Sequence, residues 1–287
     1  MTVSYPPSLP RHLVEKAVRA AFEEDLGQAG DITSQATIAP DATAVARINA
    51  RTGGVICGIE CALAAFAMIG PGLEVEVLAG DGSVVDAGAG VMEVRGNARA
   101  LLAAERTALN FLTHLSGIAT LTRRYVDQTE DSRAHICCTR KTTPGLRALE
   151  KYAVRCGGGR NHRFGLDDAI LIKDNHIAVA GGVGAAIAAA RAFAGHLVAI
   201  EVEVDTLLQL EEALAAQANA ILLDNMDDDT LAQAVAIAAG RASLEASGNV
   251  TLDRVAAIAR TGVDYISTSR ITAAADPLDL GLDITIA

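Results

Sequence analysis

The chain has 287 residues, of which 51% are hydrophobic, and it carries a formal net charge of −11 at pH 7. This length permits one large domain or two of ordinary size, each with a buried core. The negative charge argues against a general nucleic-acid-binding surface or a surface for anionic membranes, because both need broad positive potential.

The targeting and cysteine patterns favour a cytoplasmic protein without a structural zinc site. The first 18 residues contain no basic stretch followed by an apolar core, and no apolar run reaches the length of a membrane span. Cys57 and Cys61 lack a second pair, and Cys137 and Cys138 are adjacent in an apolar run. We therefore expect reduced core cysteines, no membrane partner and a cytoplasmic location.

The first part of the chain, residues 1–117, is predicted to be a small open sheet with helices. Apolar residues at helical spacing predict helices over 11–26, 58–69 and 98–116. Strands are predicted over 43–49, 53–57, 73–79 and 91–94, and residues 30–34 are predicted to form a turn. The alternating pattern of these strands leaves one face of the sheet exposed to solvent.

From residue 135 onward, short apolar runs alternate with helical segments, which is typical of a parallel sheet covered by helices. The six predicted strands are 135–139, 169–174, 197–204, 220–226, 242–247 and 265–269. Helices are predicted at about 145–156, 183–194, 206–217, 230–239 and 251–261. Six strands instead of eight predict an incomplete parallel α/β barrel over 118–275 and allow 276–287 to pack back on the first domain.

Polar side chains follow the predicted barrel strands, where each strand leads into a loop. They are Thr139, Arg140, Lys141, Lys173, Glu203, Asp224, the turn Ser247-Gly248-Asn249 and the turn Thr268-Ser269-Arg270. Because the carboxyl ends of parallel strands meet at one mouth, we expect a single site. The two turns favour a phosphate, and the acidic pair favours Mg²⁺ or a sugar diol, simple pairing with the lysines being the alternative.

The segment from Cys137 to His176 reverses the sign of the chain's charge. It holds eight Lys and Arg against four Asp and Glu, a net charge of +4, beside three glycines at 157–159. Arg presents a planar fork that matches carboxylate or phosphate, and Lys adds a point charge. We interpret the segment as the wall of an enclosed pocket for a polyanion, the alternative being a basic surface helix with a flexible glycine loop.

These motifs together resemble the quinolinate phosphoribosyltransferase family. The resemblance is carried by EEDLGQAGDITS at 23–34, ERTALNFLTHLSGIAT at 105–120, TRKTTPGLRALEKYAVRCGGGRNHRFGLDDAILIKDNH at 139–176, EVEVDT at 201–206, LLDNM at 222–226 and EASGNV at 245–250. It implies an open-faced α/β sandwich followed by an incomplete α/β barrel, in homodimers or hexamers. It also implies the reaction of quinolinate with phosphoribosyl pyrophosphate and Mg²⁺ to give nicotinate mononucleotide, pyrophosphate and CO₂ in NAD biosynthesis.

The resemblance also implies roles for individual residues. The basic quinolinate pocket falls on Arg140, Lys141, His162, Arg163 and Lys173. Lys141, Glu203 and Asp224 are the implied catalytic residues, the two acids binding ribose and metal, and further substrate contacts fall on Thr139 and on the turns at 247–249 and 268–270. Arg106 is implied to cross a subunit interface into the partner's site.

One departure from the family pattern lies after the last strand. Many members carry a Gly-Ala-Leu-Thr-His type sequence there, whereas this chain reads Ser-Arg-Ile-Thr-Ala at 269–273. The 5′-phosphate contacts are therefore the part of the site that the resemblance supports least, although Arg270 adds a cation of its own.

Two other functions remain open at this point. The nearer is a paralogous transferase of the molybdenum-transport type on the same fold, although NHR at 161–163 and KDNH at 173–176 fit the quinolinate enzyme better. The other is a Schiff-base lyase that uses Lys141 or Lys173 at a strand end. A noncatalytic anion-binding barrel would leave Glu203 and Asp224 without a role.

Overall fold

The computed structural model describes residues 8–286 and separates into two compact units. The first contains the described residues up to Arg123, residues 142–158 and those from Ile271 onward, and the second contains 124–141 and 159–270. Residues 118–123, 142–158 and 271–275 thus group with the first unit, whereas the predicted domains 1–117 and 118–275 place them with the barrel. Residues 1–7 and 287 of the predicted domains lie outside the described part of the chain.

The first unit is built on an antiparallel sheet with the strand order β12-β1-β5-β3. Its strands are β1 (Thr43–Ala50), β3 (Glu74–Val77), β5 (Gly90–Asn97) and β12 (Leu280–Ile286), and a separate ladder joins β2 (Gly54–Val55) to β4 (Val84–Val85). Every second residue of β1 is buried, as expected of a sheet with one covered face. Strand β12 comes from the end of the chain, where the sequence pattern predicts no strand.

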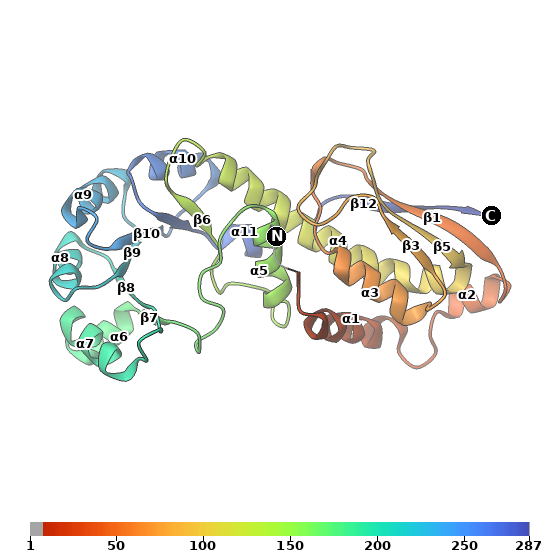
Figure 1. Ribbon diagram of the computed structural model, residues 1–287, viewed down its shortest axis with the longest axis horizontal. Helices are drawn as coiled ribbons and strands as arrows, with labels where there is room; N and C mark the ends of the chain where they lie inside the picture. The colour runs from red at the N-terminus through yellow and green to blue at the C-terminus, as the bar shows by residue number, and fades with distance from the viewer. Residues whose placement is uncertain (1–7, 287) are drawn as a thin grey trace, which may run out of the picture. The chain divides into compact units, whose positions relative to one another are not determined.

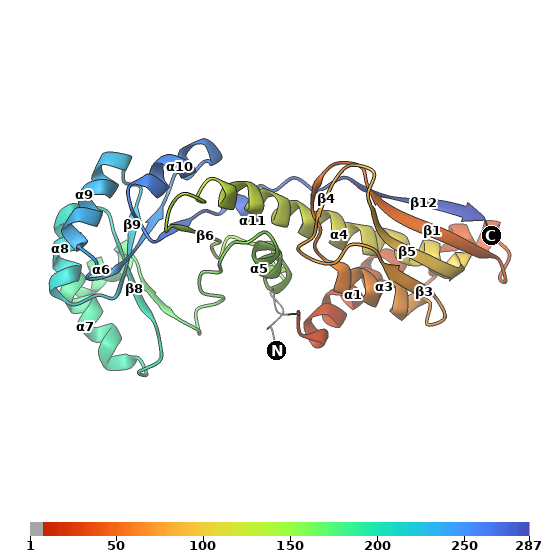
Figure 2. The ribbon, with the colours of Figure 1, turned by 45° about the horizontal axis from the view of Figure 1, so that its top comes forward.

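Helices α1, α3 and α4 lie on one side of this sheet (Figure 2). The helices that begin in the first unit are α1 (Arg11–Leu26), α2 (Ile32–Thr37), α3 (Ile59–Ile69), α4 (Ala98–Asp127) and α5 (Arg147–Cys156). The predicted helices over 11–26 and 58–69 are confirmed to within one residue.

Two local predictions in the first unit were wrong. Residues 32–34 belong to helix α2 instead of a turn, because the side chain of Asp31 accepts a hydrogen bond from the backbone N–H of Ser34 at 3.0 Å and so caps the helix. The helix predicted over 98–116 continues to Asp127, because Gly117 does not interrupt it. A single glycine inside an apolar helical pattern therefore does not end this helix.

The second unit is an open barrel whose six parallel strands are ordered β6-β11-β10-β9-β8-β7 (Figure 1). Its strands are β6 (His135–Cys137), β7 (Ile170–Ile172), β8 (Ile200–Val204), β9 (Ala220–Asp224), β10 (Ser243–Ser247) and β11 (Tyr265–Ser267). The helices that follow β7 are α6 (Asp174–Ala180), α7 (Val183–Phe193), α8 (Leu207–Ala215), α9 (Asp228–Ala238), α10 (Leu252–Arg260) and α11 (Arg270–Ala273). The predicted fold class, an incomplete parallel barrel preceded by an α/β sheet domain, is confirmed.

Strands β6 and β7 follow each other along the chain but stand at opposite edges of the sheet. Strand β6 pairs instead with β11, the last strand of the barrel, through Ile136 and Ile266. The connection from β6 to β7 therefore begins and ends at the two sides of the opening. It stays attached to β6 at one point, because Arg160 forms an isolated parallel bridge with Cys137.

Strand β7 is shorter than predicted. The sequence predicts a strand over 169–174, but the strand ends at Ile172 and helix α6 begins at Asp174. The backbone N–H of Lys173 donates to Nδ1 of His176 at 2.9 Å, which helps to start the helix. Lys173 thus stands at the junction between a strand and a helix.

No single helix within residues 8–286 is long and apolar enough to cross a membrane. The bent pair of helices α6 and α7 meets the length and composition requirements only when the two are taken together.

All five cysteines are buried and free. Cys57, Asp81 and Cys156 of the first unit bring ligand atoms within 4.8 Å of one another, a grouping that their spacing in the sequence does not predict.

We expect Gly117→Ala to destabilise the first unit. Alanine favours a helix by about 1 kcal/mol over glycine, but a Cβ at residue 117 would lie 2.2 Å from the carbonyl oxygen of Asp276 and 3.0 Å from Cα of Pro277. Because both neighbours are backbone atoms, the net loss in the free energy of unfolding should be roughly 1–3 kcal/mol. Chemical denaturation measures it.

A second helical glycine provides the control. At Gly184 of α7, no atom lies within 4 Å of the place that a methyl group would occupy, so Gly184→Ala should leave stability unchanged or raise it by about 0.5 kcal/mol. An unchanged or raised stability of Gly117→Ala would contradict the close approach of residues 276 and 277.

Candidate active site

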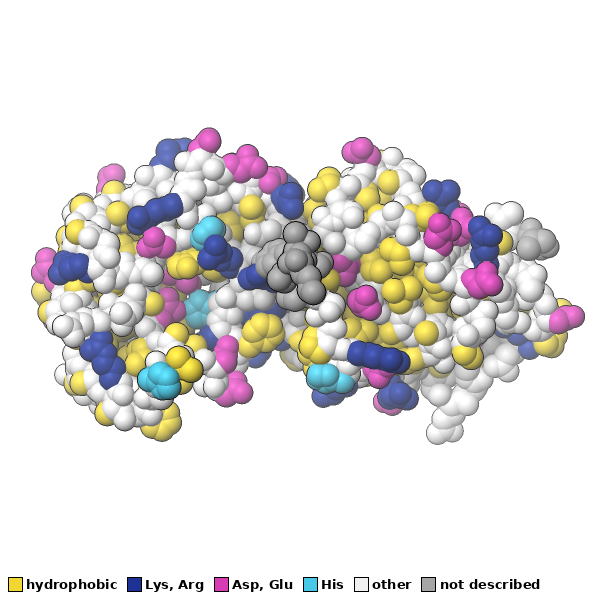
Figure 3. Space-filling model, viewed as in Figure 1, with side chains coloured by type: hydrophobic (Ala, Val, Ile, Leu, Met, Phe, Trp, Pro, Cys, Tyr) yellow, Lys and Arg dark blue, Asp and Glu magenta, His cyan; other side chains and the backbone are white. Residues whose placement is uncertain are grey.

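The second unit encloses a cavity of about 740 Å³ at the carboxyl ends of its strands. Charged and histidine side chains surround the hollow in this unit (Figure 3). Fourteen predicted site residues line the cavity: Thr139, Arg140, Lys141, His162, Arg163, Lys173, Glu203, Asp224, Ser247, Gly248, Asn249, Thr268, Ser269 and Arg270. The structure therefore brings together all of the predicted site residues that the barrel carries.

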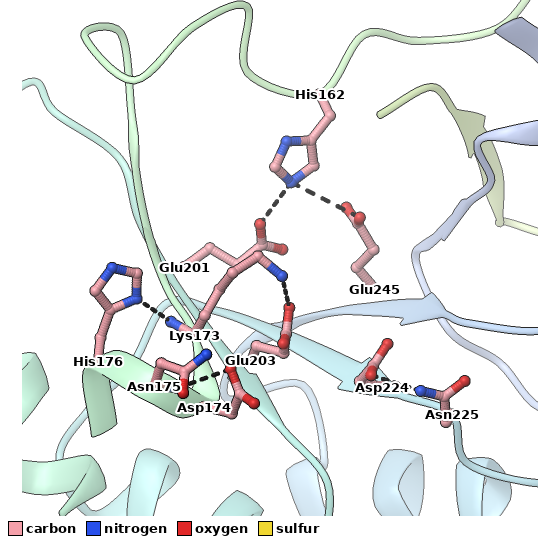
Figure 4. A network of polar contacts seen from close by, with 10 residues as sticks. All are labelled: His162, Lys173, Asp174, Asn175, His176, Glu201, Glu203, Asp224, Asn225 and Glu245. Carbon is pink, nitrogen blue, oxygen red and sulfur yellow. Dashed lines mark hydrogen bonds and ion pairs between the residues drawn. The ribbon is translucent and has the colours of Figure 1, made fainter. Parts of the chain in front are cut away.

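The acidic side of the cavity begins on β8, where Glu201 and Glu203 occupy alternate positions and so share one face of the strand. Nζ of Lys173 donates to Oε2 of Glu203 at 2.5 Å (Figure 4). The Glu203 side chain is 10% exposed, whereas that of Lys173 is 47% exposed. The ion pair thus fixes a buried carboxylate at the cavity wall and leaves part of the lysine accessible.

Asp224 ends the neighbouring strand, β9, and its carboxylate is held by Asn225. Nδ2 of Asn225 donates to Oδ2 of Asp224 at 2.6 Å. Burial raises the pKa of Asp224, and the negative charge of Asp205 raises it further, whereas the positive charges of Lys173 and Lys141 lower it. This corner of the cavity therefore contains carboxylates that repel one another beside two ammonium groups, an arrangement that a bound cation would relieve.

The basic side of the cavity is carried by the connection from β6 to β7. The bridge of Arg160 to Cys137 and the hydrogen bond from the Cys138 N–H to the Arg160 carbonyl, at 3.1 Å, hold this connection along β6. His162 and Arg163 follow directly and therefore enter the cavity. Nε2 of His162 lies 2.7 Å from Oε2 of Glu201.

Arg163 is held in place on one side and leaves a donor unused. Its Nη1 donates to the carbonyl of Ala169 at 3.0 Å, whereas its buried Nε has no hydrogen-bond partner among the described residues. Burial, with the like charge of Arg140, lowers the pKa of Arg163. A buried guanidinium with an unsatisfied N–H beside another arginine is suited to bind an anion.

The two polar turns lie at the ends of β10 and β11. Gly248 has a φ of 84° and Asn249 a φ of 51°, and Nδ2 of Asn249 donates to Oδ1 of Asn225 at 3.2 Å. In the other turn, the N–H of Arg270 donates to Oγ1 of Thr268 at 3.2 Å. Both turns are held by side-chain contacts, and together they supply small polar groups at the cavity rim.

Arg106 is a predicted site residue that the barrel does not carry. It is an exposed residue of helix α4 in the first unit and does not belong to the residues that line the barrel cavity. Its predicted place at a subunit interface stays a prediction.

Four polar residues of the site were not assigned from the sequence: Glu201, Asn225, Glu245 and Ser267. Asn225 and Glu245 line the cavity, and Glu201 contacts His162. A signal for Glu245 was present, because a lone carboxylate in the apolar strand over 242–247 needs a partner. Its partners, however, are brought together only by the fold.

The cavity is therefore divided by charge. One side offers arginines, lysines and a histidine, and the other offers carboxylates on adjacent strands, with two polar turns between strand ends and solvent. Such a site can hold an anionic ring beside a sugar phosphate or a metal-bound phosphate. No neutral or purely apolar ligand would use these groups.

Two family models match the chain and together cover most of it. Residues 31–116 match the N-terminal domain of quinolinate phosphoribosyl transferase, and residues 118–283 match the C-terminal domain of that family.

Whole-chain comparisons agree with the family models. A probable nicotinate-nucleotide pyrophosphorylase [carboxylating] of Bacillus subtilis is 44% identical over 95% of this chain and 94% of its own length. The nicotinate-nucleotide pyrophosphorylase of Mycobacterium leprae is 44% identical over 93% of this chain and 95% of its own length. Among solved structures, the nicotinate-nucleotide pyrophosphorylase from Francisella tularensis is 40% identical with a TM-score of 0.94, covering 99% of this chain and 100% of its own.

We expect Gly248→Ala to lower stability more than Gly240→Ala. Both glycines have positive φ, 84° and 76°, so alanine at either position costs roughly 1–2 kcal/mol in backbone strain. A Cβ at residue 248 would also lie 2.2 Å from Oδ1 of Asn225, whereas no atom lies within 4 Å at residue 240. The difference between the two variants in chemical denaturation should be about 1–3 kcal/mol. Equal losses would show that Asn225 is not held against the turn.

Proposed function

The chain belongs to the quinolinate phosphoribosyltransferase family, and we propose that the barrel cavity is the site of its reaction. The chain transfers phosphoribose from phosphoribosyl pyrophosphate to quinolinate with decarboxylation, as an enzyme of NAD biosynthesis. The observation that carries the assignment of the site is the convergence of the basic and acidic residues in one cavity.

Quinolinate binds on the basic side of the cavity. Its two carboxylates match the guanidinium groups of Arg140 and Arg163 and the ammonium group of Lys141. The unsatisfied Nε of Arg163 supports this position, because an anion would complete its hydrogen bonds. The fixed cluster orients the ring so that its nitrogen faces the sugar.

The phosphoribosyl group binds on the acidic side. Glu203 and Asp224 stand on adjacent strands and accept hydrogen bonds from ribose hydroxyl groups, and the polar turns at 247–249 and 268–270 bind the 5′-phosphate. Arg270 adds a positive charge in the turn that departs from the family pattern.

Mg²⁺ fits the donor set at this side of the cavity. Glu203 and Asp224 offer carboxylate oxygens, and the charge of Asp205 that raises the pKa of Asp224 is a repulsion that a cation removes. When bound with the substrate, Mg²⁺ supplies positive charge for the pyrophosphate oxygens.

The chain's own residues then guide two steps. In the first, the ring nitrogen attacks the anomeric carbon while pyrophosphate departs, and the carboxylates of Glu203 and Asp224 stabilise the positive charge that develops on the ribose. In the second, the ring, now a pyridinium, accepts the electrons of the carbon–carbon bond as CO₂ leaves. Lys141 lies beside Asp224 and places its ammonium group near the reacting atoms.

The ion pair of Lys173 argues against a Schiff-base lyase. A Schiff-base lysine needs a free amino group to attack a carbonyl, whereas Nζ of Lys173 is held by a hydrogen bond to Glu203.

We expect the protein to release CO₂ from quinolinate only when phosphoribosyl pyrophosphate and Mg²⁺ are both present. Glu203→Gln should lower kcat by roughly 10²-fold and raise the Mg²⁺ concentration needed for half-maximal rate, because it removes one charge from the metal site. A continuous assay of CO₂ release with a Mg²⁺ titration measures both.

Asp229→Asn, which removes a carboxylate from the exposed outer helix α9, is the matched control and should behave as the wild type. Absence of CO₂ release from the wild type under these conditions would refute the function, and an unchanged Mg²⁺ requirement in Glu203→Gln would refute the metal site.

Arg106 is proposed to complete the site of a partner subunit in a homodimer or hexamer. Its exposure on helix α4 leaves the guanidinium available to a second chain. In a two-fold assembly each subunit would then complete the site of the other.

Mixing two inactive variants tests this arrangement. Arg106→Ala and Lys141→Ala should each be inactive alone, whereas a mixture of equal amounts under subunit exchange should regain roughly a quarter of wild-type activity, because half of the dimers carry one intact site of two. A tagged pair demonstrates the exchange. No recovery after exchange would place Arg106 outside the partner's site.

A further inference from the structure

His162, Glu201 and Glu245 form a compact cluster at the base of the cavity. Nε2 of His162 lies 2.7 Å from Oε2 of Glu201 and 3.8 Å from Oε1 of Glu245 (Figure 4). The three residues come from the β6–β7 connection, from β8 and from β10, so the cluster exists only in the folded barrel. His162 and Glu245 both line the cavity.

Glu245 is the most buried member of this cluster. Its side chain is 7% exposed, and its Oε1 has no hydrogen-bond partner among the described residues. A buried carboxylate without enough donors is costly, whereas a protonated carboxyl group is cheaper to bury. Burial and the negative charge of Glu201 raise the pKa of Glu245 to about 7.

Glu245 is surrounded by residues from the neighbouring strands and from the β6–β7 connection. Glu201 on β8 adds negative charge, and Cys137 on β6 is close enough to feel the charge of Glu245. His162 on the β6–β7 connection and the hydroxyl of Ser267 on β11 act in the opposite direction and lower the pKa of Glu245. On β9 the residue in register is the apolar Leu222. This environment allows Glu245 to exchange a proton near neutral pH.

A metal ion is the other ligand that a histidine and two carboxylates can hold, and the ligand atoms lie within 4.8 Å of one another. The charge of Glu201, however, already acts on the guanidinium of Arg163. A divalent cation would therefore stand beside a fixed positive charge, whereas a proton adds no more than one unit of charge. The surroundings favour a proton.

The reaction needs a proton at this side of the cavity. When CO₂ leaves, the bond between the ring carbon and its carboxylate breaks and both electrons stay on the ring carbon. That carbon then takes up one proton, so each turnover consumes a proton that replaces the lost carboxylate.

We propose that Glu245 holds this proton and passes it from its carboxyl group to the ring carbon, its carboxylate being left behind. The inference rests on the proposed function for the identity of the acceptor. Glu201 accepts a hydrogen bond from Nε2 of His162 and orients the imidazole beside Glu245. Glu245 lines the cavity and is thus the proton donor that touches the substrate, whereas His162 and Glu201 are positioning residues.

Infrared difference spectroscopy tests proton storage without the reaction. The substrate-free wild type, titrated from pH 5.5 to 8.5, should lose the carbonyl band of a protonated carboxyl group with a midpoint of about 7, the pKa of Glu245. Glu245→Gln should lack this band, whereas Glu211→Gln, on an exposed position of α8, should keep it. A wild-type spectrum without the band would overturn the inference.

Kinetics test delivery of the proton. Because the stored proton is lost as pH rises, wild-type kcat should fall above a pH of about 7, the pKa of Glu245. Glu245→Gln cannot store a proton, so its kcat should be roughly 10²-fold lower and nearly independent of pH from 6 to 8.5, with KM for quinolinate within about twofold of the wild type. A wild-type kcat and pH profile in this variant would overturn the inference.

Two further measurements separate this proposal from misfolding and from an error in the proposed function. Glu245→Asp keeps a carboxyl group and should recover part of the pH dependence that Glu245→Gln loses. If kcat falls and KM for quinolinate rises together in both variants, the role of Glu245 is purely structural and proton delivery is refuted. If the wild type releases no CO₂ from quinolinate, the proposed function fails, while the infrared result still decides whether Glu245 stores a proton.

Discussion

The alternation of side chains along short parallel strands determines where each acidic group in the cavity can stand. A strand of five residues such as β8 has one face toward the helices and one toward the interior, so Glu201 and Glu203 must point the same way. The same rule places Glu245 and Ser247 together on β10. Charges that belong to separate stretches of sequence are thereby held within a few ångströms, without any flexible loop to relax their repulsion.

That constraint also explains why the ionisable groups of the cavity are perturbed in different directions. Asp224 and Glu245 are buried beside other carboxylates, so their pKa values rise, whereas the guanidinium of Arg163 is buried beside Arg140, so its pKa falls. The Lys173–Glu203 ion pair balances one charge of each sign. An anionic substrate and a cation would balance the remaining charges, which gives the barrel a built-in preference for charged ligands.

Much of the fold and of the site could be predicted from the sequence, because buried strands and the polar residues after them leave a clear pattern. The six barrel strands and the acids at the ends of β8 and β9 follow from it. The length of helix α4 was missed because Gly117 does not interrupt the helix, and strand β12 was missed because its partner, β1, is distant in sequence. Glu245 was missed for the same reason: its meaning depends on His162, which lies far from it along the chain.

At the opening between β6 and β7, the basic and the acidic residues of the cavity stand on different kinds of structural element. Among the described strands no hydrogen-bonded pair spans that opening, and the connection that leaves β6 is held to it by the bridge between Cys137 and Arg160. This connection carries Arg140, Lys141, His162 and Arg163, whereas the acids stand on paired strands. The groups proposed to hold the aromatic acid therefore depend on the course of one connection, whereas those proposed to hold the sugar depend on strand pairing.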